Sequence, residues 1–145
     1  MVRITSASFE ELDLRTAYAV WRLRQQVFVV EQDCPYLDLD DRDQEPGTRH
    51  LLLHDGDQLA GYVRVLAEPE AMRIGRVVLD PAFRGRGLAD DLMRTAIEQT
   101  GERPVLLAAQ APLAGWYATF GFVVDGPGFL EDGIPHVPMR REPGP

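Results

Sequence analysis

The sequence contains no lysine and no asparagine, so all 15 of its basic residues are arginine. A phosphate-binding loop of the GxxxxGKS or GxxxxGKT kind requires a lysine, which excludes a nucleoside triphosphatase of that class. The lysine Schiff base that holds pyridoxal phosphate and the lysine with which a protein kinase holds ATP are excluded for the same reason. The arginine bias is typical of a GC-rich genome, but the chemical exclusions hold whatever its origin.

The chain has a single cysteine, Cys34, and its longest uninterrupted apolar runs are about five residues. One cysteine excludes an internal disulfide and a four-thiolate zinc site. Apolar runs this short exclude a membrane-spanning helix and a secretory signal peptide, so we expect a cytoplasmic protein without a membrane partner. The formal net charge of −8 and the pI of about 4.8 argue against nucleic acid as a partner.

The 145 residues have the length of one domain, and we expect residues 1–145 to form a single unit. Apolar periodicity and turn residues predict the order β, α, loop, β, β, β, α, β, α, β, β. This order predicts an α/β domain whose mixed sheet is antiparallel at first and parallel at one βαβ unit. A capping box of Ser8 and Glu11 is expected to begin the first helix. The predicted strands are 2–5, 50–54, 59–66, 72–79, 104–109, 121–124 and 135–141, and the predicted helices are 9–30, 87–100 and 112–120.

A glycine-rich turn follows the strand predicted at 72–79 and opens the next helix. It consists of Arg84, Gly85, Arg86, Gly87, Leu88 and Ala89. Backbone N–H groups at a helix N-terminus lack partners and attract anions, and glycine lets the backbone approach them closely. The pattern indicates a phosphate site, although an ordinary connection with two solvated arginines also fits it. A dinucleotide loop is disfavoured, because Asp90 stands where that motif has a third glycine.

The same turn resembles a family motif. Residues 84–89 are similar to the Q/R-x-x-G-x-G/A pyrophosphate loop of the GNAT family of acetyl-CoA-dependent N-acetyltransferases, and Tyr117–Phe122 resembles that family's Y-x-x-x-G-F signature. Further strings resemble the ElaA-like branch of the family, so that the similarity extends from about residue 14 to 140. These strings are Val27–Asp38, Arg49-His50, Ile74–Val77, Ala109–Ala111 and Glu131–His136.

The resemblance implies a GNAT-type acyl-CoA N-acyltransferase fold and direct acetyl transfer from acetyl-CoA to a primary amine in a ternary complex, with no metal. It places the pyrophosphate on residues 84–89 and the thioester on the backbone of Val77, Val78 and Leu79, where a backbone N–H would bond the carbonyl. Tyr117 would contact the cofactor and act as the general acid that protonates the departing thiolate, because tyrosine is neutral at pH 7 and donates one O–H.

The general base is left open by the sequence. Its candidates are Glu31, Glu131, His50 and His136, and an ordered water chain is the alternative to all four. The matched strings imply a set of acceptor-binding residues, namely Cys34, Tyr36, Asp38, Gln110 and Glu131. A covalent acetyl-cysteine is disfavoured, since the acidic residues near Cys34 would raise the pKa of its thiol.

Most of the negative charge belongs to one segment. Residues 31–45 carry seven acidic residues against Arg42 alone, which is −6 of the chain's −8. An acidic cluster at a cleft concentrates cations, so this segment predicts recruitment of a cationic amine acceptor. A solubilising surface loop is the alternative interpretation.

Two other functions stay open at this level: a non-catalytic acyl-CoA-binding sensor, and a protein-interaction module on the same fold. The acceptor itself could be a small molecule or a peptide, that is, a polyamine, an aminoglycoside-like compound, an amino acid or a protein N-terminus. A homodimer paired through an exposed sheet edge is also left open.

Overall fold

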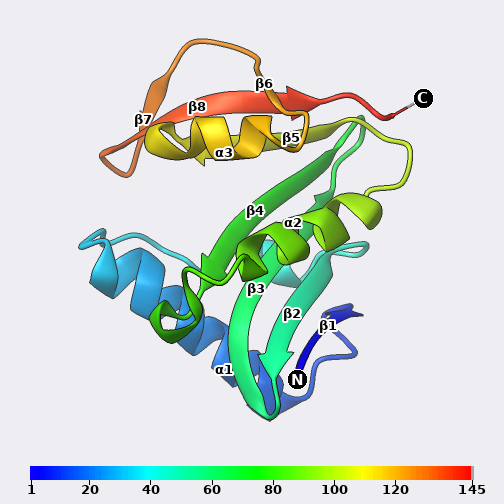
Figure 1. Ribbon diagram of the computed structural model, residues 1–145, viewed down its shortest axis with the longest axis vertical. Coiled ribbons are helices and arrows are strands. Elements are labelled where there is room, and N and C mark those ends of the chain that lie inside the picture. Colours follow the sequence, from blue (N-terminus) through cyan, green and yellow to red (C-terminus); the bar gives the residue numbers. More distant parts are fainter. Residues whose placement is uncertain (145) are drawn as a thin grey trace.

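An eight-stranded mixed sheet forms the centre of the protein (Figure 1). The structure is a computed structural model and describes residues 1–144. The strand order is β1-β2-β3-β4-β5-β8-β6, with β7 pairing only with β8, and β4 and β5 are parallel while the other pairs are antiparallel. The strands are β1 (Val2–Ala7), β2 (Arg49–Asp55), β3 (Gln58–Ala67), β4 (Met72–Leu79), β5 (Val105–Gln110), β6 (Val123–Val124), β7 (Phe129–Glu131) and β8 (Ile134–Arg141).

Two long helices cover opposite faces of the sheet, because the central strands alternate between two apolar clusters. In β2, Leu51 and Leu53 pack in the cluster with the residues of α2 (Leu88–Glu98), whereas Leu52 packs in the cluster with α1 (Leu14–Arg24). The alternation follows from the two-residue repeat of a strand, and it explains why this strand is apolar on both faces. The expected α/β class with a mixed sheet is confirmed.

The first helix begins later than the sequence predicts. Ser8 and Glu11 do exchange the two hydrogen bonds of a capping box, at 2.8 and 3.3 Å, but they close a separate turn. The helix begins at Leu14, where the Asp13 carboxylate accepts a hydrogen bond from the Thr16 N–H at 2.7 Å. Asp13 is therefore the N-cap, and the helix continues through a π-helical stretch, η1 (Gln25–Glu31).

Strands β4 and β5 lie side by side only at their start. Their register pairs Met72 with Val105 and Arg73 with Leu106, after which β5 pairs along its whole length with β8. Figure 1 shows β4 running away from β5 beyond this point. The β5-facing edge of β4 is therefore free of strand pairing from residue 74 to Leu79, which opens the sheet in its middle.

The C-terminal third differs from the sequence prediction in one element. The strand β7 was not predicted; it forms a tight hairpin with β8, the strand predicted at 135–141, with Glu131 opposite Ile134. Asp132 and Gly133 both have left-handed backbone, with φ of 50° and 79°, as a two-residue hairpin turn requires. The expected pairing between the strand at 121–124 and the last strand is confirmed by β6 and β8.

Short helical turns complete the fold. They are η2 (Arg42–Gln44), η3 (Pro81–Phe83) and η4 (Ala111–Leu113), the last leading into α3 (Ala114–Ala118). Within residues 1–144, no helix has both the length and the apolar character needed to cross a membrane.

Candidate active site

A cleft of about 930 Å³ lies where β4 and β5 diverge. Its walls come from both strands, the segment that follows η1, the turn before α2, helix α3 and the β7–β8 turn. Among the predicted site residues, those that line it are Glu31, Cys34, Tyr36, Val77, Val78, Leu79, Arg84, Ala89, Gln110, Tyr117, Glu131 and His136. Residues 85–88 stand between two lining residues of the glycine-rich turn, whereas Asp38 lies behind the wall.

The glycine-rich turn presents its backbone to solvent at the start of α2. Gly85 and Gly87 have left-handed φ angles of 81° and 73°, and Gly87 is the N-cap of the helix. No atom would lie within 4 Å of a Cβ built on either glycine, so an anion has room to approach the N–H groups there. The Arg86 guanidinium lies over the Phe83 ring, 5.2 Å from its centroid.

Arg84 is directed at a carboxylate of the protein. Its two terminal nitrogens donate to both oxygens of Glu31, at 2.8 and 3.1 Å. The pairing with Arg84 lowers the pKa of Glu31, so this carboxylate stays ionised and accepts a proton poorly. Glu31 therefore lies in the cleft but has surroundings that do not suit a general base.

Tyr117 is buried in α3 with its ring held edge-on by aromatic neighbours, Trp116 at 4.8 Å and Phe122 at 6.2 Å between ring centroids. Trp116 in turn donates its indole N–H to Asp90 at 2.8 Å, which ties α3 to α2. Burial raises the pKa of Tyr117 to about 12, so its hydroxyl keeps its proton at neutral pH.

His136 and Glu131 face one another beside the β7–β8 turn. The Nδ1 of His136 lies 2.7 Å from the Ile134 carbonyl oxygen, which can only accept, so Nδ1 carries the proton in the neutral ring. Its Nε2 is then the unprotonated nitrogen, 3.6 Å from a Glu131 oxygen. The ring is stacked on Phe129, with 5.8 Å between centroids. This arrangement leaves one ring nitrogen able to accept a proton.

His50, the remaining base candidate, lies outside the cleft. It is 1% exposed, and its Nε2 donates to the Asp43 carbonyl at 2.9 Å while its Nδ1 accepts from the Tyr62 hydroxyl at 2.5 Å. Burial lowers the pKa of His50, which keeps it neutral in this structural position.

Two polar contacts join the segment after η1 to the far side of the cleft. Gln110 of β5 donates its amide to the Gln32 side chain at 3.2 Å, and the Cys34 thiol contacts the Asp132 carbonyl at 3.4 Å. Cys34 is buried, which suits a structural donor. Gln32 was not among the predicted site residues, because its partner is distant in the sequence.

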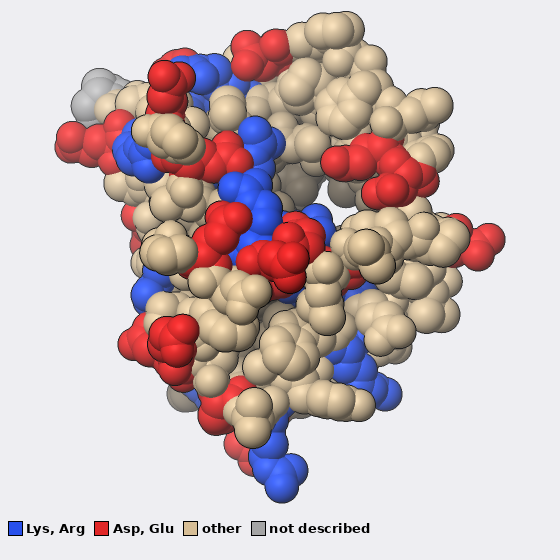
Figure 2. Space-filling model, turned by 180° about the vertical axis from the view of Figure 1, so that it is seen from behind, with Lys and Arg blue, Asp and Glu red and all other residues tan. Residues whose placement is uncertain are grey.

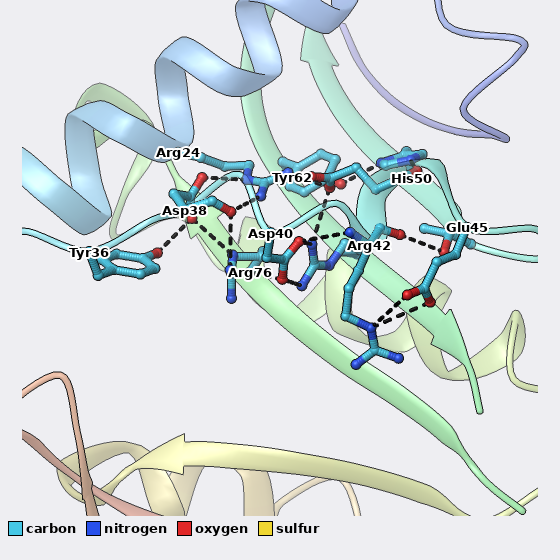
Figure 3. A network of polar contacts seen from close by, with 12 residues as sticks. Arg24, Tyr36, Asp38, Asp40, Arg42, Glu45, His50, Tyr62 and Arg76 are labelled. Atoms are coloured by element: carbon cyan, nitrogen blue, oxygen red, sulfur yellow. Dashed lines mark hydrogen bonds and ion pairs between the residues drawn. The ribbon is translucent and has the colours of Figure 1, made fainter. Parts of the chain in front are cut away.

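The acidic segment folds onto arginines. Figure 2 shows acidic and basic side chains packed together across the middle of the face seen from behind, beside a hollow. Figure 3 shows their centre, where the fully buried Arg24 donates to Asp38 and Asp43 at 2.8 and 2.6 Å. Burial opposes the charge of Arg24, but its hydrogen bond to Asp43 and both negative charges outweigh that effect and raise its pKa.

Asp40 extends this network toward the cleft. It accepts a bidentate pair of hydrogen bonds from Arg64, at 2.8 and 2.9 Å, and a third from Arg76 at 3.2 Å (Figure 3). Arg64 also reaches Asp43 at 3.2 Å. Five of the segment's seven acidic side chains thus have arginine partners, namely Glu31, Asp38, Asp40, Asp43 and Glu45, so its charge is largely used within the fold.

The three arginines of this network were missed by the sequence analysis. Arg24 continues the apolar stripe of α1, and Arg64 shares its strand face with Tyr62, as the two-residue repeat requires. A charged residue on an otherwise apolar face is a signal of a buried ion pair, and that signal was present in the sequence.

The fold and the cleft define the class of protein: its architecture is that of an acyl-CoA N-acyltransferase. Residues 23–143 match the family model described as acetyltransferase (GNAT) domain, and the chain belongs to this family. Membership supports acyl transfer from an acyl-CoA co-substrate. Within residues 1–144, no group of three or more His, Cys, Asp or Glu side chains is arranged to hold a metal ion.

Relatives cover nearly the whole chain. The chain is 38% identical to Protein ElaA of Escherichia coli over 149 residues, which cover 98% of this chain and 97% of ElaA. It is 44% identical over 137 residues to a UPF0039 protein of Mycobacterium tuberculosis, covering 91% of this chain and 88% of that protein. The predicted resemblance to the ElaA-like branch is confirmed.

Two crystal structures have the same fold. That of Escherichia coli ElaA superposes with a TM-score of 0.93 at 38% identity, covering 98% of this chain and all of the other. The crystal structure of an acyl-CoA N-acyltransferase from Pseudomonas aeruginosa superposes with a TM-score of 0.92 at 39% identity, covering 97% of this chain and 99% of the other.

Asp40 gives the network a testable pH dependence. Burial disfavours its charge, but Arg64 and Arg76 outweigh burial and lower its pKa to about 2, against about 3.9 in an unfolded chain. Because the folded pKa is the lower one, the ionised pair stabilises the fold above about pH 4 and is lost toward pH 2. We expect the free energy of unfolding, measured by urea titration, to fall less steeply over this range in Asp40→Asn than in the wild type.

The matched control is Asp57→Asn, in the exposed β2–β3 turn outside the network. It should keep the wild-type slope. A wild-type slope in Asp40→Asn would contradict the assignment.

Proposed function

We propose that the chain transfers an acetyl group from acetyl-CoA to a primary amine, by direct attack of the amine in a ternary complex. The observation that carries this proposal is the β5-facing edge of β4 at Val77–Leu79, which has no strand partner and lies in one cleft with the glycine-rich turn and the Tyr117 side chain. Strand backbone without partners offers hydrogen-bond donors and acceptors for an extended ligand.

The residues around the turn fit the phosphates of CoA. Open space in front of Gly85 and Gly87 and the N-terminus of an 11-residue helix suit a pyrophosphate. Arg86 lies beside them at the surface, whereas Arg84 would bind phosphate only on leaving Glu31. Backbone N–H groups are therefore the main phosphate ligands in this proposal.

Acid and base would come from two elements of the C-terminal part of the cleft, helix α3 and strand β8. A backbone N–H of Val77–Leu79 would polarise the thioester carbonyl, and the Tyr117 hydroxyl would protonate the departing thiolate. We assign the proton-accepting role to His136 with Glu131, because in the neutral ring Nε2 is the accepting nitrogen and it lies 3.6 Å from the carboxylate. An alkyl ammonium group has a pKa near 10, so a proton acceptor is needed before attack.

A cationic acceptor would meet negatively charged side chains at the β7–β8 turn. Glu131 and Asp132 line the cleft, and among the described residues neither carboxylate pairs with an arginine. Asp38, Asp40 and Asp43 are engaged in the arginine network. A cationic acceptor would therefore be drawn to the hairpin.

The test of the function is an acetylation screen over polyamines, aminoglycosides, amino acids and short peptides, with thiol release as readout. Each cationic amine is paired with an uncharged amine of similar size. We expect turnover with at least one class. Binding of acetyl-CoA by calorimetry without turnover on any amine would contradict the enzyme and favour an acyl-CoA sensor.

Replacing Gly87 tests the phosphate site. In Gly87→Val a β-branched side chain would stand in left-handed backbone before the N–H groups, so we expect acetyl-CoA affinity to fall by about tenfold or more. Gly56→Val is the matched control: Gly56 has a φ of 60° and equally open surroundings, but lies in the β2–β3 turn. It should lose similar stability, about 1–2 kcal/mol, and bind acetyl-CoA normally. Equal affinities would contradict the phosphate assignment.

Replacing Tyr117 tests the general acid. Tyr117→Phe keeps the aromatic packing and removes the hydroxyl, so kcat should fall by about tenfold or more while the Kd for acetyl-CoA stays within about twofold. Tyr18→Phe, at an exposed position of α1, should change neither quantity. A wild-type kcat in Tyr117→Phe would refute the role.

A further inference from the structure

Strand β4 contains an irregularity at Arg76. Tyr62 of β3 pairs with Val78 and Arg64 pairs with Gly75, so Arg76 and Val77 together face the single residue Val63. This is a β-bulge, and Arg76 adopts a left-handed backbone there, with φ of 55°. Side chains other than glycine rarely adopt this conformation, because Cβ crowds the following carbonyl. Something outside the local backbone must therefore hold it.

The Arg76 side chain supplies that hold. Its Nε forms an ion pair of 2.9 Å with an Asp38 oxygen, at an angle that is not that of a hydrogen bond. One terminal nitrogen donates to the Asp38 carbonyl at 3.1 Å and to Asp40 at 3.2 Å. The guanidinium lies 5.6 Å from the centroid of the Tyr36 ring. Arg76 is thus bound to the segment 36–40 through four contacts (Figure 3).

Asp38 is itself immobilised. The fully buried Arg24 donates to its carboxylate and to its carbonyl, both at 2.8 Å, and the Tyr36 hydroxyl donates to its second oxygen at 2.5 Å. Burial and the bond to Asp38 raise the pKa of Tyr36, which keeps that donor protonated. Asp38, which binds the Arg76 guanidinium, is therefore held in a fixed position in the protein interior.

The backbone of Arg76 lies next to the proposed reaction centre. Val77 is the second residue of the bulge and Val78 follows it; both line the cleft and have no strand partner on the β5 side. Because the Asp80 N–H donates to Ala60 of β3, the alternation of the ladder directs the Val78 N–H toward β3 as well. The N–H groups that can face the cleft are therefore those of Val77 and Leu79. A bulge turns the backbone that follows it, so the conformation of residue 76 sets the direction of the next N–H groups. Under the proposed function, these groups bond the thioester carbonyl.

We propose that Arg76 is a positioning residue: its ion pair with Asp38 holds the β4 bulge so that the backbone N–H of Val77 is aimed at the thioester carbonyl. The inference rests on the proposed function. It gives part of the acidic segment a task, because Asp38 and Asp40 serve as counter-ions for the bulge. It also explains why an arginine stands where glycine would be less strained.

Arg76→Gly removes the ion pair with Asp38 but still permits the left-handed backbone at residue 76. Glycine adopts a φ of 55° without strain, so the bulge remains allowed while nothing holds it. We expect kcat to fall by about tenfold or more with the Kd for acetyl-CoA within about threefold, since the phosphate site is untouched. Arg76→Lys keeps the charge but lacks the planar guanidinium, so its kcat should lie between those of Arg76→Gly and the wild type.

A spectroscopic readout needs no acceptor. The stretching band of a ¹³C-labelled acetyl carbonyl in bound acetyl-CoA reports the hydrogen bond to it. In Arg76→Gly this band should move to higher frequency and broaden relative to the wild-type complex. Arg49→Gly is the matched control, because Arg49 is a strand arginine that pairs with Glu11 outside the cleft. It should leave the band and kcat unchanged.

The outcomes separate the two proposals. A wild-type band and a wild-type kcat in Arg76→Gly, with normal acetyl-CoA binding, would overturn the positioning role alone. Failure of the wild-type protein to bind acetyl-CoA would overturn the proposed function and this inference with it. A changed Kd with an unchanged band would also overturn the positioning role, because Arg76 would then act on binding.

Discussion

The charge of Arg24 is the constraint on which one side of the molecule depends. This side chain is fully buried, and a buried guanidinium is tolerated only with anionic partners and satisfied hydrogen bonds. Asp38 and Asp43 supply both, and each of them also contacts a further arginine, on β4 and β3 respectively. Helix α1, the irregular segment after it and the centre of the sheet are joined by this one requirement.

That requirement changes the meaning of the charge distribution. Counted along the chain, residues 31–45 hold most of the net negative charge and indicate a surface that attracts cations. In space, Asp38, Asp40 and Asp43 neutralise arginines that arrive from α1, β3 and β4. The negative charge that is in excess along the sequence is therefore balanced by arginines in the fold. Among the described residues, the carboxylates that line the cleft without an arginine partner lie at a different place, the β7–β8 turn.

Sequence reasoning reached the parts of the fold that depend on local patterns. The strand at 72–79 was predicted with the bounds of β4, because a β-branched run ends at Asp80-Pro81. The helix start at Leu14 was missed because a capping box can also close an isolated turn. The three-residue β7 was missed because so short a strand shows no alternation of apolar and polar residues. The turn at 84–89 was predicted because all the residues of its motif follow one another in the sequence. The partners of Arg24 and Arg76 lie 14 or more residues away, so tertiary structure alone pairs them.

Residues 31–38 contact four parts of the cleft wall. Glu31 binds the turn before α2, Gln32 reaches β5, Cys34 reaches the β7–β8 turn, and Asp38 holds the bulge of β4. These four contacts share one short stretch of backbone, so a shift at any of them is transmitted to the others along the chain. Phosphate binding that draws Arg84 away from Glu31 would release one end of this stretch while Arg24 keeps the other end fixed. The buried ion pair thus fixes the geometry of the β4 bulge, whereas the part of the cleft nearest the glycine-rich turn is held only by the exposed pair of Glu31 and Arg84.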